Sequence, residues 1–294
     1  MHFFSKIKRY LIDIGISKNI PDEKYLKDLY RKQLGKELDL ENPKTYNEKI
    51  QWLKLHDRNS LYSKLVDKYE VKDYVASIIG EEYIIPTIGV WKKFSDIDFE
   101  KLPNQFVLKC TNDSGGIIIC KDKKAFSKWK SKIKLTLYGK RNFYYRSREW
   151  PYKNVKPRII AEKYMEDERC HELRDYKFFC FHGKAELMFV ASNRQGEGET
   201  YFDFFDMNYQ HLDIINGHPN APQMPEKPKN FDKMIKFAEM LSKDIPHVRV
   251  DFYEVNDKLY FGELTFYHWS GLVPFNPEEW DYKLGDMIDL SKVK

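Results

Sequence analysis

Residues 249–265 read RVDFYEVNDKLYFGELT, two runs of alternating polar and apolar residues around a short polar turn. This period of two predicts an antiparallel β-hairpin. We take residues 256–258 as a three-residue turn, which pairs Val255 with Leu259. In that register Asp251 lies directly opposite Glu263. The hairpin therefore predicts two carboxylates that face each other across one ladder.

Two further polar residues share the face of these carboxylates. Arg249 lies opposite Thr265, and alternation along the strands places both beside the acids. Opposed carboxylates repel one another, and a hard cation such as Mg²⁺, which prefers oxygen ligands, would remove that cost. Arg249 suits a phosphate. The alternative is a structural salt bridge between Arg249 and one acid. Apolar residues occupy the other face: Val250, Phe252, Leu264 and Phe266.

A second motif combines a lysine with a glycine-rich loop. Residues 106–110 and 117–120 are two apolar runs that predict strands, and Lys109 stands near the end of the first. The loop between them contains Asn-Asp-Ser-Gly-Gly at 112–116, and backbone N–H groups in such loops can hold phosphates. It is not a Walker loop, because it lacks the G-x-x-x-x-G-K-[ST] spacing. A tight turn without a ligand is the alternative.

Two weaker motifs complete the set. Residues 159–165, IIAEKYM, predict a strand that runs into charged residues, either at a pocket edge or as an ordinary strand exit. Asp67-Lys68 lies in a stretch, residues 61–79, that we expect to be one helix ended by Gly80. A solvated helix pair is the alternative there.

The remaining elements follow from periodicity and from turn residues. We expect a helical start with a helix at Pro21-Asp22-Glu23, another opened by Pro43, and later helices at 124–137 and 231–243. A second hairpin is expected at 176–181 and 185–191, and the proline-rich residues 216–228 predict a loop. Hairpins with interspersed helices indicate an α+β chain with antiparallel sheets.

The four motifs, in this order and spacing, resemble the ATP-grasp superfamily, and most closely its TupA-like branch from bacterial surface-polysaccharide gene sets. The resemblance covers about residues 45–285. It implies an ATP-grasp-like fold, in which two α+β lobes with antiparallel sheets sandwich a nucleotide after a helical N-terminal region. The expected regions are the helical residues 1–80, a small lobe with the glycine-rich loop at 81–158, and a large lobe with the metal site at 159–294.

The resemblance also implies roles for single residues. Lys68 and Lys109 would contact ATP phosphates, with Lys109 and Arg249 acting in catalysis. The remaining nucleotide contacts would be Ser114, Gly115 and Gly116 over the phosphates, Glu162, Lys163 and Met165 at the adenine, and Glu168 at the ribose. Asp251 and Glu263 would hold Mg²⁺.

This sequence departs from the family pattern after Glu263. Thr265 stands where the family usually has Asn; its hydroxyl could still bind the metal ion, but the number of ions stays open. The usual Pro-Gly is replaced by residues 268–271, HWSG. Aromatic and cationic residues suit sugar and carboxylate acceptors, with loop packing as the alternative: Arg146, Arg148, Trp150, Tyr152, Arg194 and His268. Gly271 is a further expected substrate residue.

The function implied is a Mg-ATP-dependent carboxylate–amine ligase that works through an acyl phosphate, serving surface-polysaccharide assembly. It would attach an amino acid or another amine to a sugar carboxylate. A glycosyltransferase using a nucleotide sugar would also employ a carboxylate-bound metal, but we find no Rossmann-like strand–helix alternation at the N-terminus. A non-catalytic assembly partner that keeps a nucleotide site is the third possibility.

Composition narrows the class of protein. The 294 residues carry 50 basic and 45 acidic side chains, a modest net charge of +5. Solvated helix faces explain its lysine-rich patches better than nucleic acid does, and anionic substrates such as nucleotides fit the charge equally well. No apolar run reaches the roughly 18 residues of a membrane span, and four cysteines without C-x-x-C spacing suit reduced core thiols in a cytoplasmic protein. Residues 1–16 predict a basic amphipathic helix. That helix suits either an anionic membrane surface or the protein's own core.

Overall fold

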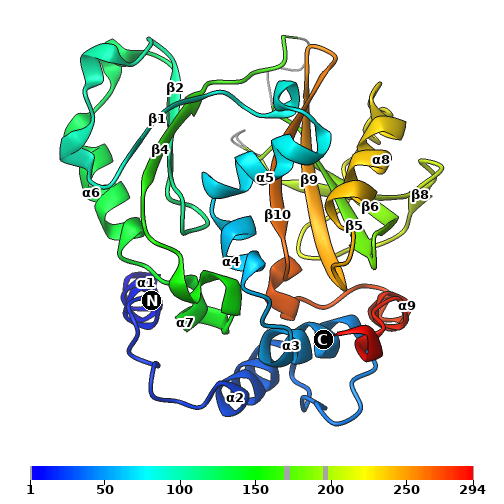
Figure 1. Cartoon of the computed structure of the whole chain (residues 1–294). Helices are drawn as coiled ribbons and strands as arrows, with labels where there is room; N and C mark the ends of the chain where they lie inside the picture. Colours follow the sequence, from blue (N-terminus) through cyan, green and yellow to red (C-terminus); the bar gives the residue numbers. More distant parts are fainter. Residues whose placement is uncertain (1, 169–172, 195–197, 294) are drawn as a thin grey trace. The chain divides into compact units, whose positions relative to one another are not determined.

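The computed structural model describes residues 2–168, 173–194 and 198–293. The chain divides into two compact units (Figure 1). Unit 1 contains Met1–Tyr25, Arg58–Tyr74 and Ile85–Tyr164, and unit 2 contains Leu26–Asp57, Val75–Ile84 and Met165–Lys294. Helices α2 (Asp22–Leu34) and α5 (Glu70–Ile79) run across the division. Each unit is therefore assembled from separate stretches of the chain.

Unit 1 is built on a four-stranded antiparallel sheet with the strand order β1-β4-β2-β3. Alternate residues of β2 point into a core that Leu135 of α6 closes from one side. The described elements of this unit are α1 (His2–Asp13), α4 (Leu61–Val66), β1 (Thr87–Trp91), β2 (Phe106–Cys110), β3 (Ile117–Cys120), α6 (Lys128–Gly139), α7 (Phe143–Ser147) and β4 (Ile159–Lys163).

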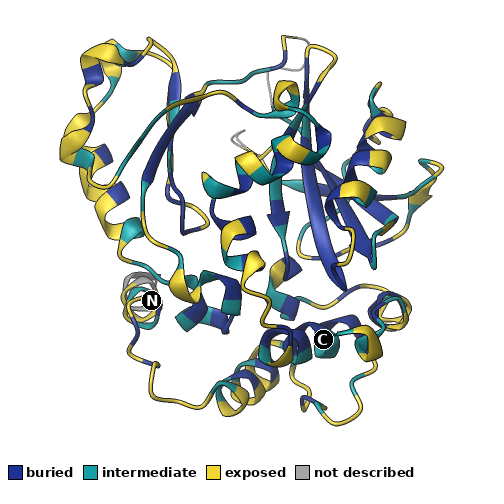
Figure 2. Ribbon diagram, in the orientation of Figure 1, coloured by how far each residue is buried: buried dark blue, intermediate teal, exposed yellow. Residues whose placement is uncertain are grey.

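Unit 2 is built on a six-stranded antiparallel sheet with the strand order β10-β9-β5-β6-β7-β8. Helix α8 covers one face, where Phe231 contacts Phe178, and Tyr46 of α3 packs against Phe179 on the other. Figure 2 shows how completely the central strands are buried. The described elements are α3 (Tyr46–His56), β5 (Asp175–Phe181), β6 (Lys184–Ser192), β7 (Tyr201–Asp206), β8 (His211–Leu212), α8 (Phe231–Leu241), β9 (His247–Val255), β10 (Lys258–Thr265) and α9 (Glu279–Asp286).

The hairpin β9–β10 has the expected pairing but reaches it differently. The expected three-residue turn is wrong: Val255 pairs with Lys258 across a two-residue turn, in which Asn256 and Asp257 both have positive φ. A β-bulge at Gly262 then shifts the register by one residue, so that Glu263 lies opposite Asp251 after all. A Cβ at Gly262 would lie 3.0 Å from the Asp251 carbonyl oxygen, so only glycine fits without a shift.

The helix expected at 61–79 is interrupted at Asp67. This residue is buried and extended, and its Oδ1 accepts hydrogen bonds from the backbone N–H groups of Tyr69 and Glu70. Its other oxygen accepts from Arg158 at 2.9 Å. Asp67 thereby ends α4 and caps the start of α5, as short polar side chains do at helix N-termini. Asp67-Lys68 is therefore a helix junction and not a solvated pair within a helix.

Several other expectations can be compared with the structure. The α+β class with two antiparallel sheets is confirmed, and β2 and β3 have the expected bounds. Strand β4 pairs with β2, which places residues 159–163 in unit 1 and not in the region expected from residue 159 onward. We did not anticipate β7, β8, α7 or α9. Three cysteines are buried free thiols, and Cys170 lies outside the described residues.

Candidate functional site

One face of the unit 2 sheet carries a row of charged side chains. Asp175 and Lys177 alternate along β5, and Arg249 and Asp251 alternate along β9, which is paired with β5. Because side chains two residues apart share a face, all four lie on the side opposite Phe178 and Val250. Glu263 joins them from β10. The sheet therefore places acids and cations side by side in a mostly buried setting.

Asp251 is the centre of this row. It is 0% exposed. Its Oδ1 accepts a 2.7 Å hydrogen bond from Nε of Arg249, and its Oδ2 accepts another of 2.7 Å from Nη2 of Arg249. Lys177 Nζ also donates to Oδ2. A buried carboxylate is stable only when it is paired, and here a bidentate arginine and a lysine satisfy it.

A histidine and an asparagine orient Arg249 from behind. Nη1 of Arg249 lies 2.6 Å from Nδ1 of His268, and Nε2 of His268 lies 2.8 Å from Oδ1 of Asn216. Since a guanidinium can only donate, Nδ1 must accept and Nε2 must carry the proton. Burial and the charge of Arg249 hold the pKa of His268 well below its usual range, which agrees with a neutral ring. His268 thus positions the guanidinium.

A second acid continues the row. Asp175 is buried, and burial alone would raise its pKa, but the charges of Lys177 and Arg194 hold that pKa below its usual value. Lys177 Nζ lies 3.1 Å from Oδ1 of Asp175, and Arg194 donates to Oδ2. Lys177 is therefore shared between two aspartates, one on its own strand and one on β9.

These residues could take a metal ion together with an anion. Three cations (Lys177, Arg194 and Arg249) offset three carboxylates (Asp175, Asp251 and Glu263). The Glu263 side chain is 45% exposed and lies 3.6 Å from Arg249. Among the described residues no group of three or more His, Cys, Asp or Glu could hold a metal ion. The opposed pair Asp251 and Glu263 suits Mg²⁺, which usually takes one or two carboxylates plus phosphate oxygens.

Unit 1 contains a smaller charged cluster on its own sheet. Glu162 of β4 is buried, and its carboxylate lies 2.6 Å from Nζ of Lys109 and 2.5 Å from Nζ of Lys72. Burial would raise the pKa of Glu162, but the two lysines lower it to about 2. Two cations against one anion leave positive charge on this face of the four-stranded sheet, as a phosphate site requires.

The glycine-rich loop after β2 is held from two sides. Lys68 Nζ donates to the Asp113 carbonyl oxygen at 2.8 Å. Gly115 has φ +106°, a conformation that favours glycine, and a Cβ at Gly116 would lie 3.0 Å from Tyr138 Cβ. Ser114 and Gly115 are exposed. The loop therefore exposes Ser114 and Gly115 to solvent, while the residues on either side of them are held by Lys68 and Tyr138.

Asp113 in this loop gives a pH-dependent prediction. Burial raises its pKa to about 6. Nη1 of Arg141 lies 3.8 Å from its Oδ2, and among the described residues its carboxylate oxygens lack a hydrogen bond of normal geometry. A raised folded-state pKa means that the native state binds more protons than the unfolded chain between about pH 4 and pH 6. The stability that Asp113 contributes is thus present below about pH 4 and lost as pH rises through about 6.

We expect Asp113→Asn to raise the free energy of unfolding at pH 7.5 by about 1 to 3 kcal/mol, and to leave it nearly unchanged at pH 4. Urea denaturation of both proteins across that range measures the difference. Asp122→Asn, at an exposed aspartate of the same unit, is the control. An Asp113→Asn variant that is less stable at pH 7.5 would show that the charged form is stabilising.

The sequence matches one family of known proteins. The sequence model of a family described as TupA-like ATPgrasp matches residues 48–289. The chain belongs to the TupA-like ATP-grasp family. The match includes both the lysine cluster of unit 1 and the charged row of unit 2. ATP-grasp enzymes use ATP with Mg²⁺, so the expected cofactors agree with the family. No curated protein matches the sequence significantly.

Solved structures similar to this TupA-like chain include several ligases. The D-alanine–D-alanine ligase from Bacillus anthracis shares 18% identity at a TM-score of 0.47, covering 80% of this chain and 72% of that one. The D-alanine–D-alanine ligase from Helicobacter pylori shares 14% identity at a TM-score of 0.44, and the alignment covers 84% of this chain and 67% of that one. N5-carboxyaminoimidazole ribonucleotide synthetase from Thermus thermophilus shares 13% identity at a TM-score of 0.37, and the alignment covers 70% of this chain and 48% of that one. The alignment spans only 53% of the ATP-bound Bacillus anthracis ligase chain. The family assignment therefore rests on the sequence match.

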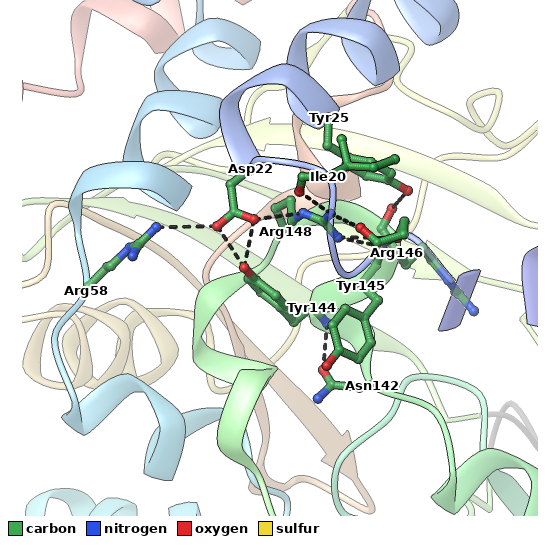
Figure 3. A network of polar contacts seen from close by, with 10 residues as sticks. Ile20, Asp22, Tyr25, Arg58, Asn142, Tyr144, Tyr145, Arg146 and Arg148 are labelled. Carbon is green, nitrogen blue, oxygen red and sulfur yellow. Dashed lines mark hydrogen bonds and ion pairs between the residues drawn. The ribbon is translucent and has the colours of Figure 1, made fainter. Parts of the chain in front are cut away.

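Arg148 is not available as a substrate residue, which corrects our expectation for it. Its side chain is 1% exposed, and its Nε pairs with Asp22 at 2.9 Å (Figure 3). It also donates to the carbonyl oxygens of Ser17 and Ile20, at 2.7 and 3.1 Å. Arg146 likewise binds Asp13. Both arginines hold the N-terminal segment against α7, so the loop-packing alternative applies to them.

Other expected residues have varied surroundings. Arg194 pairs with Asp175 at the end of the charged row, and His268 contacts Arg249 from behind it. Gly271 has φ +59°, and a Cβ there would lie 2.6 Å from Ile50 of α3, so close packing requires glycine. Tyr152 contacts Phe143 through its ring. Lys163 is exposed, Met165 is partly buried, and the Glu168 backbone N–H donates to Asn256 at 3.0 Å. Nucleotide roles for these three residues stay predictions.

Sequence reasoning missed Lys177, Asp175 and Lys72. The sequence does contain a pattern that indicates the first two. Residues 175–181 read DYKFFCF, in which Asp175 and Lys177 are two residues apart, and so on one face, in an otherwise uncharged strand. A charged pair on one face of a buried strand needs a partner, and β9 supplies it. Lys72 had no such signal: it lies in a helix of mixed composition, and only the tertiary fold brings it to Glu162.

Proposed function

We propose that this chain is a Mg-ATP-dependent carboxylate–amine ligase that forms an amide bond through an acyl phosphate. The observation that carries the proposal is the charged row on β5, β9 and β10. On one sheet face it combines two opposed carboxylates for a metal ion with two cations, Lys177 and Arg249, for phosphate oxygens, and Arg194 pairs with Asp175 beside them. A purely structural row would have no need of the partly exposed Glu263 beside a fully buried Asp251.

Each charged residue then has a proposed task. Asp251 and Glu263 hold Mg²⁺, with the Thr265 hydroxyl as a further oxygen ligand; the ion would neutralise charge on the phosphates of ATP. Arg249, fixed by His268, binds the transferring phosphoryl group, and Lys177 turns from Asp251 to a phosphate oxygen. Lys109 and Lys68, with the Ser114–Gly116 loop, bind ATP phosphates. Fixed cations of this kind stabilise phosphoryl transfer electrostatically.

The chemistry proceeds in two steps. A substrate carboxylate oxygen attacks the γ-phosphorus of ATP, and the bond to the β-phosphate oxygen breaks to release ADP. The amine nitrogen then attacks the acyl carbon, the C–O bond to phosphate breaks, and the amine loses a proton to solvent or a base. Arg249 and Lys177 offset the charge on the phosphoryl oxygens in both steps.

The substrate class is proposed from the family resemblance and from Arg194. The Arg194 side chain is 47% exposed and pairs with Asp175 at the end of the row, where it can bind an anionic acceptor. We propose that the carboxylate belongs to a sugar acid of a bacterial surface polysaccharide and that the amine is an amino acid or a similar compound. An enzyme that consumes ATP would do so in the cytoplasm.

Ligand-dependent stability tests nucleotide use. Mg-ATP at about 100 times its dissociation constant should raise the free energy of unfolding by roughly 2.7 kcal/mol. A melting scan with Mg-ATP, with a Mg-UDP-sugar and with neither measures this. Lys109→Ala should diminish the shift because it removes a cation from β2, whereas Lys124→Ala, at an exposed lysine of the same unit, should leave it unchanged. A shift with the UDP-sugar alone would favour a glycosyltransferase.

A further inference from the structure

Two helices of unit 1 expose apolar stripes to solvent. On α1 and the residue after it, Ile7, Leu11 and Ile14 are 42%, 39% and 46% exposed. On α6, Trp129, Ile133 and Leu137 are 71%, 41% and 43% exposed. Spacings of three or four residues align each set along one side of its helix. We call these six residues the α1–α6 face.

The opposite sides of both helices are already packed. Ser131 and Leu135 of α6 are buried, and Leu135 belongs to the core of the four-stranded sheet. On α1, Asp13 is buried and accepts hydrogen bonds from Arg146 Nε and Nη2, at 2.8 and 2.5 Å. Neither stripe can turn inward without breaking these contacts. The exposure is therefore built into the fold of unit 1.

A buried polar network fixes the orientation of α1. Arg148 pairs with Asp22 and binds the carbonyl oxygens of residues 17 and 20, and Tyr144 Oη donates to Asp22 at 2.7 Å (Figure 3). This network anchors the chain that follows α1. The ends of the two helices also meet, because Asn142 N donates to the Asp13 carbonyl oxygen at 2.8 Å and Arg141 Nε lies 3.3 Å from its carboxylate. Both helices lie along the left edge of Figure 1.

Positive charge surrounds the exposed stripes. Helix α6 contains four lysines at every second position from 128 to 134 and no acid, and α1 exposes Lys8 and Arg9 while its one acid, Asp13, is buried. Lysines four residues apart on a helix repel one another. An anionic partner would relieve this repulsion and cover the apolar stripes at the same time.

We propose that the α1–α6 face docks unit 1 on an anionic phospholipid bilayer. Apolar stripes flanked by lysine and arginine are the pattern of helices that lie in the membrane interface. A nucleic acid would satisfy the lysines but leave Trp129 and its neighbours exposed. Among the described residues no helix is long and apolar enough to cross a membrane, so the contact is peripheral. The proposal does not depend on the ligase reaction.

Vesicle flotation of the full chain tests the docking. The protein should float with vesicles of equal parts phosphatidylcholine and phosphatidylglycerol, but not with phosphatidylcholine alone, and added salt should weaken binding. Trp129→Ser with Ile133→Ser, and separately Lys130→Glu with Lys132→Glu, should each lower the partition coefficient about tenfold or more. The matched control is Met240→Ser with Lys236→Glu, two exposed residues of α8 in unit 2, which should bind as the unchanged chain does.

Fluorescence gives a second measurement that does not depend on these variants folding equally well. Trp129 is one of six tryptophans, so the difference between the unchanged chain and Trp129→Phe isolates its signal. Quenching of that signal by brominated lipid in anionic vesicles supports the proposal. Failure to float with anionic vesicles overturns it, as does equal loss of binding in the α8 control. A concentration-dependent dimer that the Trp129→Ser/Ile133→Ser variant abolishes would also overturn it, by identifying a second copy as the occupant.

Discussion

Asp251→Asn should abolish turnover and destabilise the protein at the same time. Asn keeps the size of Asp251 but removes the charge that binds Mg²⁺, and loss of one such electrostatic group costs on the order of a thousandfold in kcat. It also leaves Arg249 without its bidentate partner in a fully buried setting. Removing one partner of a buried ion pair lowers the free energy of unfolding, here by about 3 kcal/mol. This is the low end of the usual range, because Lys177 remains paired with Asp175 after the substitution.

A buried carboxylate on the other face of the same strand provides the control. Glu254 accepts hydrogen bonds from the backbone N–H groups of Lys229 and Asn230, at 3.2 and 2.8 Å. Glu254→Gln should therefore lower stability while leaving kcat nearly unchanged. Urea denaturation and a phosphate-release assay in Mg-ATP measure both quantities for each variant. An Asp251→Asn enzyme that turns over at the normal rate would remove Asp251 from the metal site.

Glu263→Gln should lose activity without losing stability. Glu263 lies opposite Asp251, so its neutralisation removes a like-charge pair, and its 3.6 Å contact with Arg249 is partly exposed and screened. In EDTA the free energy of unfolding should stay within about 0.5 kcal/mol of the unchanged protein, or rise slightly. In Mg-ATP turnover should fall on the order of a thousandfold, because the ion loses an oxygen ligand.

Glu279→Gln, at an exposed glutamate that pairs with Lys283 on α9, is the matched surface control and should change neither quantity. The structural alternative for Glu263, a salt bridge to Arg249, makes the opposite prediction: a clearly less stable protein that still turns over. Arg249 already has two hydrogen bonds to Asp251, together with Thr265 and His268, so it has little need of Glu263 in the fold.

The hairpin shows both what the sequence could predict and where its evidence ended. Alternation predicted which residues face each other, because the buried and exposed faces of a strand differ in composition. It could not distinguish a three-residue turn from a two-residue turn followed by a bulge, since both place Asp251 opposite Glu263. Gly262 was the one residue that marked the bulge, and glycine within a strand has that meaning only in context.

Partners distant in sequence account for most of what was missed. Lys72 reaches Glu162 across 90 residues, and Asp67, expected within a helix, instead ends one helix and begins the next with Arg158 as its partner. Arg148 was placed among the acceptor residues because its neighbours are aromatic and cationic, yet its charge is used to bind the N-terminal segment. Local composition does not tell a ligand-binding arginine from one that is internally paired.

The nucleotide product tests the central claim most directly. The protein is incubated with Mg-ATP, UDP-sugars and a panel of sugar acids and amino acids, and released nucleotides are separated by chromatography. We predict multiple turnovers of ADP formation only when a carboxylate and an amine are both present, because the amine must consume the acyl phosphate, and almost no ADP from the Asp251→Asn variant. Oxygen-18 in the acid carboxylate should appear in the released phosphate, because an acyl phosphate transfers that oxygen. Release of UDP without ADP would contradict the ligase assignment.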